Sequence, residues 1–409
     1  MDRRTFLTKL LLTSGLGLGL HVYADDESNE SNNSKQQTQT NYALANTGIS
    51  DKHVVVIGGG MAGATVAKYL RLWGGSGIAV TLVEPNPIYV SNIMSNLVLS
   101  GGRKLTSLNI SYANLVTKYG ITLKQASLTS FDNTTKQVTL SDGSTLTYDR
   151  LIMATGIQLD EAYGLTTADY ASSFPHAWQA GSQTAELAKQ ITSMTNGDTF
   201  VMTIPMKPYR CPPGPYERAC LVADYLKSHN KQGAKVVVLD ENAGIQAEPE
   251  NFTTAFNTTH AGWIDYKSGV TNIQVDKTTR SITFNQGGGA QTILAKVINV
   301  IPPHKAPTVM LPLCNGGKWA PVNVLNYEST VTGMSGVHII GDASQTTQPK
   351  AGHIANQEAK VCADAIIRAF QNQQPDPDPV TNSACFSPIT NTTASCLKNR
   401  VHELKQVRQ

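Results

Sequence analysis

Two hydrophobic patterns alternate along most of the chain. Short runs of consecutive β-branched and aliphatic residues are typical of strands that are buried on both faces of a parallel sheet. Longer segments with apolar residues at helical spacing are typical of amphipathic helices. This alternation of strand and helix predicts an α/β fold. Strands are expected at 53–57, 78–83, 199–204 and 235–240, and helices at 64–73, 216–230 and 354–370.

The first 50 residues do not follow this alternation. Arg3 and Arg4 precede an apolar run at 10–20, which is too short to span a bilayer. Residues 1–24 resemble a twin-arginine export signal, and the alternative is an ordinary secretion signal with a fortuitous Arg-Arg pair. Residues 25–50 are rich in Ser, Asn and Gln and predict a flexible linker. We expect a mature protein in the periplasm.

A glycine-rich loop joins the first predicted strand to the first predicted helix. Gly58, Gly60 and Gly63 form a GxGxxG motif there. The first glycine permits a tight turn, the second lets the backbone approach a pyrophosphate, and the third lets helix and strand pack closely. Glu84 directly follows the strand at 78–83, where a carboxylate would bind ribose hydroxyls. This context predicts a dinucleotide-binding domain.

Two later segments resemble elements of flavoproteins with two dinucleotide-binding domains. Residues 148–156 resemble the strand and Ala-Thr-Gly turn that close the first FAD domain. Residues 336–343 resemble the late Gly-Asp motif, whose aspartate contacts the ribityl chain. The helix at 354–370 would point its positive N-terminal end at the flavin. The residues that we assign to FAD here are Thr155, Gly156 and Asp342, together with Lys350 in the stretch that leads into this helix.

The middle of the chain predicts a second Rossmann-like domain. Its first strand leads into a loop that contains five prolines and Cys211 instead of another GxGxxG motif. Because proline lacks an N–H donor, we expect no nicotinamide cofactor there. The fold class is therefore α/β, with two Rossmann-like dinucleotide-binding domains and a short C-terminal region. The boundaries are 1–24 for the signal, 25–50 for the linker, 51–156 for the first part of the FAD domain, 157–310 for the second Rossmann-like domain, 311–372 for the return of the FAD domain and 373–409 for the C-terminal segment.

The motif CPPGPYER at 211–218 resembles the signature of the flavoprotein subunit of flavocytochrome c sulfide dehydrogenase. The resemblance extends over roughly residues 52–390 and includes GGGMAGATVAKYL, WAPVN and GDAS…PKAGHIAN. It implies that sulfide is oxidised through FAD and a redox-active disulfide, with electrons passed to a c-type cytochrome. It also implies that Cys211 and Cys385 form this disulfide and that Glu217 handles protons.

The chemistry of these three side chains agrees with such a function. Hydrosulfide attacks a disulfide, forms a persulfide and releases a thiolate that is able to reduce a flavin. Cys211 lies near a predicted helix N-terminus, which favours its thiolate, and Glu217 is placed to accept a proton. Two alternatives remain open. In the first, the two cysteines form a passive structural disulfide. In the second, Glu217 only caps the helix N-terminus.

Three features depart from the family pattern. Asn92 occupies the position of the cysteine that often tethers FAD, so we expect non-covalent FAD. The segment after Cys385 is shorter than in the family, which weakens the expectation of a cytochrome interface. Cys314 and Cys396 have no assigned role, and the apolar spacing over 397–404 predicts a docked terminal helix.

Composition narrows the choice of partners. The net charge of +3 is too small to predict a nucleic-acid surface. The six cysteines form no CxxC pair, and no mature segment is long and apolar enough to span a membrane, so we expect neither a zinc site nor an integral membrane segment. The expected partners are sulfide and a c-type cytochrome or another soluble electron acceptor. The alternatives are a sulfide:quinone oxidoreductase and a catalytically silent FAD-binding redox sensor.

We predict that acid precipitation of the purified protein releases its flavin. An amide at position 92 cannot form a thioether, so the yellow colour should stay in the supernatant. The measurement is the flavin absorbance of the supernatant and of the washed pellet. Flavin retained in the pellet would contradict non-covalent binding.

Overall fold

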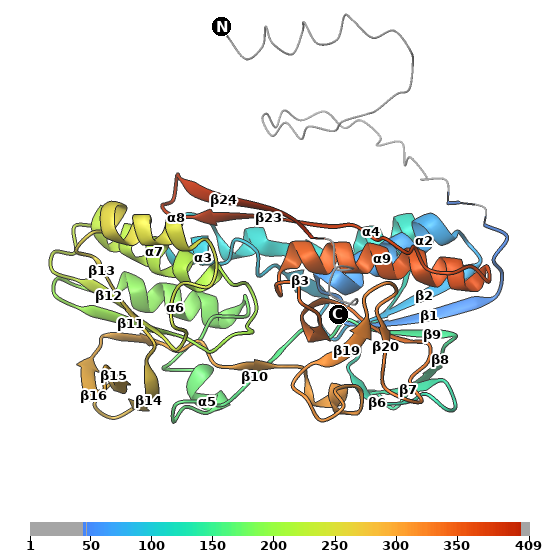
Figure 1. Cartoon of the computed structure of the whole chain (residues 1–409), viewed down its shortest axis with the longest axis horizontal. Coiled ribbons are helices and arrows are strands. Elements are labelled where there is room, and N and C mark those ends of the chain that lie inside the picture. The colour runs from blue at the N-terminus through green and yellow to red at the C-terminus, as the bar shows by residue number, and fades with distance from the viewer. Residues whose placement is uncertain (1–43, 46, 402–409) are drawn as a thin grey trace, which may run out of the picture. The chain divides into compact units, whose positions relative to one another are not determined.

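The computed structural model describes residues 44, 45 and 47–401 (Figure 1). The described residues belong to one compact unit, Tyr42–Gln409. The predicted export signal and most of the predicted linker lie outside them. The predicted fold class is confirmed: the chain is α/β with two Rossmann-like sheets, of which the first is mixed and the second parallel, and a short C-terminal region. The domain boundaries stay predictions.

The first sheet has eight strands in the order β22-β19-β20-β21-β9-β1-β2-β5. It combines two stretches that are far apart in the sequence, and β21, β9, β1 and β2 run parallel at its centre. The strands are β1 (Lys52–Ile57), β2 (Ile78–Val83), β5 (Thr122–Lys124), β9 (Arg150–Met153), β19 (Ala320–Asn323), β20 (Glu328–Ser329), β21 (Val337–Ile339) and β22 (Ser344–Gln345).

Both faces of this sheet are covered, which explains the uninterrupted apolar run in β1. Val54 and Val56 pack with α2 (Met61–Gly74) and α9 (Gly352–Phe370), and these two helices contact one another. Val55 packs on the opposite face with residues of a small antiparallel sheet. That sheet consists of β6 (Leu128–Asp132), β7 (Gln137–Leu140) and β8 (Thr145–Thr147).

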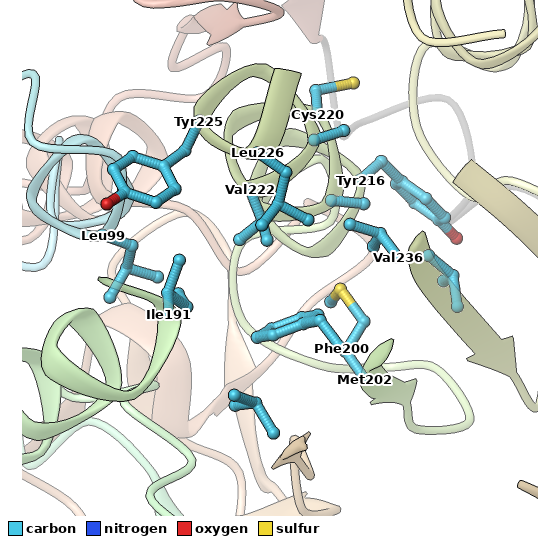
Figure 2. Close-up of a cluster of buried hydrophobic side chains, with 14 of the residues drawn as sticks. Leu99, Ile191, Phe200, Met202, Tyr216, Cys220, Val222, Tyr225, Leu226 and Val236 are labelled. Atoms are coloured by element: carbon cyan, nitrogen blue, oxygen red, sulfur yellow. The ribbon is translucent and has the colours of Figure 1, made fainter. Parts of the chain in front are cut away.

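The second sheet has four parallel strands in the order β13-β12-β11-β17. Figure 2 shows part of its core, where Phe200, Met202 and Val236 of the strands meet Val222 and Leu226 of the covering helix α7. The bounds are β11 (Thr199–Ile204), β12 (Lys235–Asp240), β13 (Ile264–Ser268), β17 (Val297–Asn299), α3 (Asn96–Leu99), α6 (Ser182–Thr192), α7 (Gly214–Ser228) and α8 (Pro249–Thr254). The predicted strands at 78–83, 199–204 and 235–240 are confirmed to the residue.

The remaining described elements are short. The helices are α4 (Ala113–Tyr119) and α5 (Thr167–Tyr170). The strands are β3 (Ile88–Val90), β4 (Asn109–Ser111), β10 (Gln158–Leu159), β14 (Thr271–Asp276), β15 (Ser281–Gln286), β16 (Gly289–Leu294) and β18 (His304–Lys305). The 3₁₀ turns are Leu105–Leu108, Thr308–Leu313 and Gly341–Ala343, and a π turn spans Ala255–Thr259.

The C-terminal segment forms a β-hairpin, so the prediction of a helix over 397–404 was wrong for residues 397–401, and its remaining residues lie outside the described ones. Strands β23 (Thr381–Pro388) and β24 (Ala394–Val401) pair antiparallel over their full lengths. Residues four positions apart share a face in a helix and also in a strand, so the apolar pair 397 and 401 fits both. Pairing with β23 selects the strand. Figure 1 shows this hairpin in red, and β23 contacts both α7 and α9.

We predict that Gly63→Ala destabilises the fold. A Cβ at Gly63 would lie 1.7 Å from the carbonyl oxygen of Gly58, so β1 and α2 would have to separate. The free energy of unfolding in urea should fall by about 3 kcal/mol or more. Gly60→Ala is the matched control, because a Cβ there meets nothing within 4 Å. Equal unfolding midpoints for the two flavin-free variants would contradict the prediction.

Candidate functional site

The glycine loop and Glu84 come together as the sequence predicts. Gly58 has a φ of +98° and donates its N–H to the carbonyl of Val83 at 2.8 Å. The N–H of Gly59 donates to Glu84 Oε2 at 2.8 Å. The other carboxylate oxygen of Glu84 accepts from the backbone and side chain of Asn86. Glu84 is thus fixed at the loop, where its carboxylate faces the predicted nucleotide site.

Two cavities adjoin at this loop. The larger one has a volume of about 750 Å³ and is lined by Gly58, Gly60, Glu84, Thr155 and Gly156 among others. The smaller one, of about 180 Å³, contains Cys211 and Asp342 in its lining. The residues that line both are Gly60, Tyr89, Asn92, Ala154, Gly156 and Arg210.

The larger cavity fits a dinucleotide such as FAD. A Cβ at Gly60 would meet nothing within 4 Å, so the backbone is open to a close ligand there. Thr155 Oγ1 is buried and has no hydrogen-bond partner among the described residues. A buried hydroxyl without a partner is costly, and a bound polar group would satisfy it. Residues 58–63 and 155–156 therefore suit the phosphates and sugar of a dinucleotide.

Asp342 and Lys350 take different places. Asp342 lines the smaller cavity, and burial raises its pKa against the charges of Arg210 and Lys350. Lys350 lines neither of the two cavities. Its Nζ donates to the carbonyls of Asp342 and Ser344, both at 2.8 Å, and lies 3.8 Å from the ring centre of Trp319. Burial lowers its pKa to about 8. Lys350 thus binds the backbone of the Gly-Asp turn from outside the two cavities.

Cys211 is held at the smaller cavity by its backbone. Its φ is +58°, and its N–H donates to the carbonyl of Lys350 at 2.7 Å. Its carbonyl accepts from Gly214 N–H at 2.9 Å, at the start of α7. The expectation of a favoured thiolate was wrong. Burial first, then the charge of Glu217, raises the pKa of Cys211 to about 12 and outweighs the helix N-terminus.

Glu217 projects from the first turn of α7 toward α3. Its Oε1 accepts from Asn96 Nδ2 at 2.9 Å, so this side chain bonds to another helix rather than capping its own. Burial raises the pKa of Glu217 to about 7, although the Asn96 hydrogen bond and the charge of Arg218 act in the opposite direction. A carboxyl group that titrates near neutral pH is suited to proton transfer.

Cys385 lies on β23, a strand that contacts α7, the helix that carries Glu217 and begins three residues after Cys211. Burial raises its pKa, with further contributions from the charges of Glu248 and Glu217, and Cys385 in turn affects the pKa of Cys211. The six cysteines, which all lie within the described residues, are free thiols. The structure therefore describes the dithiol form of the Cys211–Cys385 pair, and the resting disulfide stays a prediction.

Sequence reasoning missed Asn96 and Arg218. Arg218 is 1% exposed and donates to Asn96 Oδ1, to Asn299 Oδ1 and to the carbonyls of His176 and Ala177. The available signal was a charged residue followed directly by the apolar run of α7. Asn92 was identified, and its Oδ1 accepts from the N–H of Ala180 at 2.7 Å while it lines both cavities.

Within the described residues, no helix is long and apolar enough to cross a membrane. The same part of the chain contains no group of three or more His, Cys, Asp or Glu side chains placed to hold a metal ion.

Comparisons with known proteins agree with this arrangement. Residues 52–171 match the pyridine nucleotide-disulphide oxidoreductase family. Residues 184–302 match the central part of the sulfide dehydrogenase [flavocytochrome c] flavoprotein chain. A sequence of that flavoprotein chain from Chlorobaculum thiosulfatiphilum is 55% identical over 47 residues, which are 12% of this chain and 96% of that sequence.

The relatives that match over longer stretches of the chain share a lower sequence identity with it. The mitochondrial sulfide:quinone oxidoreductase of Dictyostelium discoideum is 24% identical over 277 residues, which are 61% of this chain but only 56% of that relative. The solved structure of the sulfide:quinone oxidoreductase from Aquifex aeolicus superimposes with a TM-score of 0.70 and 19% identity, over 85% of this chain and 87% of that one. At this identity the likeness establishes the fold.

We predict that Glu217→Gln stabilises the protein at alkaline pH. The pKa of Glu217 is about 7 in the folded protein against an ordinary value of 4.5, so stability is lost as the pH rises through this window. Each pKa unit corresponds to about 1.4 kcal/mol. At about pH 8 the variant should therefore unfold at a higher temperature than the parent, and the difference should vanish below about pH 4.5. A parent and variant that melt alike at both pH values would contradict the raised pKa.

Proposed function

This chain belongs to the sulfide:quinone oxidoreductase-like flavoproteins, which include the flavoprotein chain of flavocytochrome c sulfide dehydrogenase, and from this premise we propose that it is an FAD-dependent sulfide dehydrogenase. The observation that carries the proposal is the convergence of Cys211, Cys385 and Glu217. Cys211 lines a cavity that adjoins the dinucleotide loop, and the other two side chains lie close enough to change its pKa.

In the proposed reaction, hydrosulfide attacks one sulfur of a Cys211–Cys385 disulfide. A new S–S bond forms a persulfide on that cysteine, and the other cysteine leaves as a thiolate. The Glu217 carboxylate accepts the proton of the attacking hydrosulfide. A second hydrosulfide then removes the outer sulfur as a hydrodisulfide ion and leaves a thiol. Closing the disulfide again releases two electrons and one proton.

FAD, when bound, supplies the acceptor for these two electrons and passes them on to the final acceptor. We propose that Gly58, Gly60, Gly63 and Glu84 hold its adenosine diphosphate portion and that Thr155, Gly156 and Asp342 hold the remainder. Asn92 supports non-covalent binding, because its amide cannot form a thioether with the flavin.

We propose a c-type cytochrome or another soluble protein as the electron acceptor, as the similarity to the flavocytochrome chain supports. The proposed location is the periplasm, supported by the twin-arginine pattern at Arg3 and Arg4. A quinone is the second candidate acceptor. Ile93 supports it, because this apolar side chain lines the smaller cavity while 49% of it is exposed.

We predict that anaerobic sulfide bleaches the flavin absorbance within seconds. Cys211→Ser should keep the fold and the bound flavin, but sulfide should reduce that flavin more than about 100-fold more slowly, because the disulfide can no longer form. Cys396→Ser is the matched control, because its thiol is exposed and has no place in the proposed reaction. A parent protein that binds flavin but does not respond to sulfide would identify a silent flavoprotein.

The same reduced protein distinguishes the acceptors. Rapid reoxidation by a c-type cytochrome, with slow reoxidation by a soluble quinone, is the expected result. The reverse order would favour the quinone.

A further inference from the structure

Glu248 is a buried carboxylate to which sequence and proposed mechanism assign no role. It is 6% exposed, and it immediately precedes α8 with a φ of +50°, in the left-handed region that glutamate rarely adopts. A buried charge needs partners, and a strained backbone persists only where surrounding contacts hold it. The contacts of Glu248 therefore point to a specific task.

The partners of Glu248 are a cross-strand pair of the C-terminal hairpin and the nearby Asn251, whose Nδ2 donates to Glu248 Oε2 at 3.4 Å. Ser387 on β23 and Ser395 on β24 are direct partners in the register of the hairpin. Ser387 Oγ donates to Glu248 Oε1 at 2.8 Å, and Ser395 Oγ donates to Oε2. Asn251 Nδ2 donates to Ser395 Oγ at 2.6 Å. One carboxylate thus ties both strands of the hairpin to the segment that precedes α8.

This attachment is next to Cys385. Side chains two positions apart on a strand point to the same face, so Cys385 shares the face on which Ser387 binds Glu248. On the other side of Cys385, the N–H of Ala384 donates to His353 Nδ1 in the first turn of α9 at 2.9 Å. Cys385 is therefore held between one hydrogen bond to α9, made at Ala384, and another to the segment before α8, made at Ser387.

The carboxylate also acts on the site through its charge. It raises the pKa of Cys385, second only to burial, and contributes to the raised pKa of Glu217. Three further charged or titratable effects act on these two side chains. Arg218 on α7 lowers the pKa of Glu217, while Glu217 itself and Cys396 on β24 raise the pKa of Cys385.

We propose that Glu248 is a positioning residue of the sulfide site, which clamps the hairpin that carries Cys385 and places a negative charge beside Cys385 and Glu217. This inference rests on the proposed function, in which both side chains take part. The clamp keeps the two cysteines within reach of one another, so the disulfide closes after each turnover. The charge keeps the proton on Cys385 and on Glu217 up to a higher pH.

Two variants separate the clamp from the charge. Glu248→Gln keeps a side-chain oxygen that accepts a hydrogen bond but removes the charge. The double variant Ser387→Ala with Ser395→Ala keeps the charge but removes the two donors. Glu250→Gln is the matched control for both, because Glu250 lies in the first turn of α8 and is exposed.

The first measurement is the pH dependence of Cys385 alkylation in the flavin-bound, dithiothreitol-reduced protein, followed by peptide mass spectrometry. Glu248→Gln should lower the apparent pKa of Cys385, so that alkylation at neutral pH becomes severalfold faster. The Glu250→Gln protein should match the parent. Equal Cys385 profiles for Glu248→Gln and Glu250→Gln would overturn the role of the charge.

The second measurement is the rate at which the reduced protein closes the Cys211–Cys385 disulfide under an added oxidant. The double serine variant should close it severalfold more slowly than the parent, and a parental rate would overturn the clamp.

A third readout links Glu248 to turnover. The acid limb of the sulfide-dependent flavin reduction should move to lower pH in Glu248→Gln, because Glu217 loses its proton more easily. The ionisation of sulfide is common to both proteins and does not affect the difference. If the acid limb of Glu248→Gln stays at the parental pH, the effect of Glu248 on turnover is overturned. If sulfide fails to reduce the parent while the alkylation and closure results hold, the proposed function is wrong and the clamp and charge of Glu248 remain.

Discussion

The arrangement of the site depends on one backbone hydrogen bond between the two halves of the molecule. The N–H of Cys211 donates to the carbonyl of Lys350 at 2.7 Å and joins the loop before α7 to the segment before α9. Cys211 adopts a left-handed conformation that costs about 1 kcal/mol or more for a non-glycine residue, so its neighbours must hold it there. Gly214 makes this possible, because a Cβ at that position would lie 2.9 Å from Cys211 Sγ and 2.9 Å from the Trp178 ring. Because Gly214 has no side chain, Cys211 Sγ and the Trp178 ring can pack against it. This packing holds Cys211 in the lining of the smaller cavity.

The electrostatics of the site follow from burying Glu217 and Arg218 side by side at the start of α7. Arginine only donates hydrogen bonds, so Asn96 must present its oxygen to Arg218 and its amide group to Glu217. Asn96 therefore offers Glu217 a donor, which stabilises the ionised carboxylate, while burial favours the protonated form. The balance sets the Glu217 pKa at about 7, and burial lowers that of Arg218 to about 9. Neither effect could be anticipated from residue types alone, because both depend on how deeply α7 is buried.

The elements with strong local patterns were predictable from the sequence. The strand at 78–83 is confirmed to the residue. The glycine loop lies beside Glu84 because β1 and β2 run parallel and end at the same edge of the sheet. The predicted thiolate of Cys211 failed for a non-local reason: desolvation by the surrounding residues exceeds the effect of one helix end. The helix predicted from the apolar spacing at 397–404 failed over residues 397–401. Pairing with β23 makes this segment a strand, and the spacing of apolar residues does not reveal pairing. The role of Glu248 has no local signal, since its two serine partners lie about 140 residues further along the chain.

A raised thiol pKa has consequences for the proposed reaction. Cys211 holds its proton more tightly than Glu217 does, so ionisation of the thiol at neutral pH does not supply the thiolate. The thiolate must instead arise as the leaving group when hydrosulfide cleaves the disulfide. A thiolate of high pKa leaves more slowly but is intrinsically the stronger nucleophile once released. The buried site therefore slows the attack on the disulfide and makes the product of that attack more reactive. Glu217, which titrates near neutral pH, is the adjacent group able to exchange the protons that these steps take up and release.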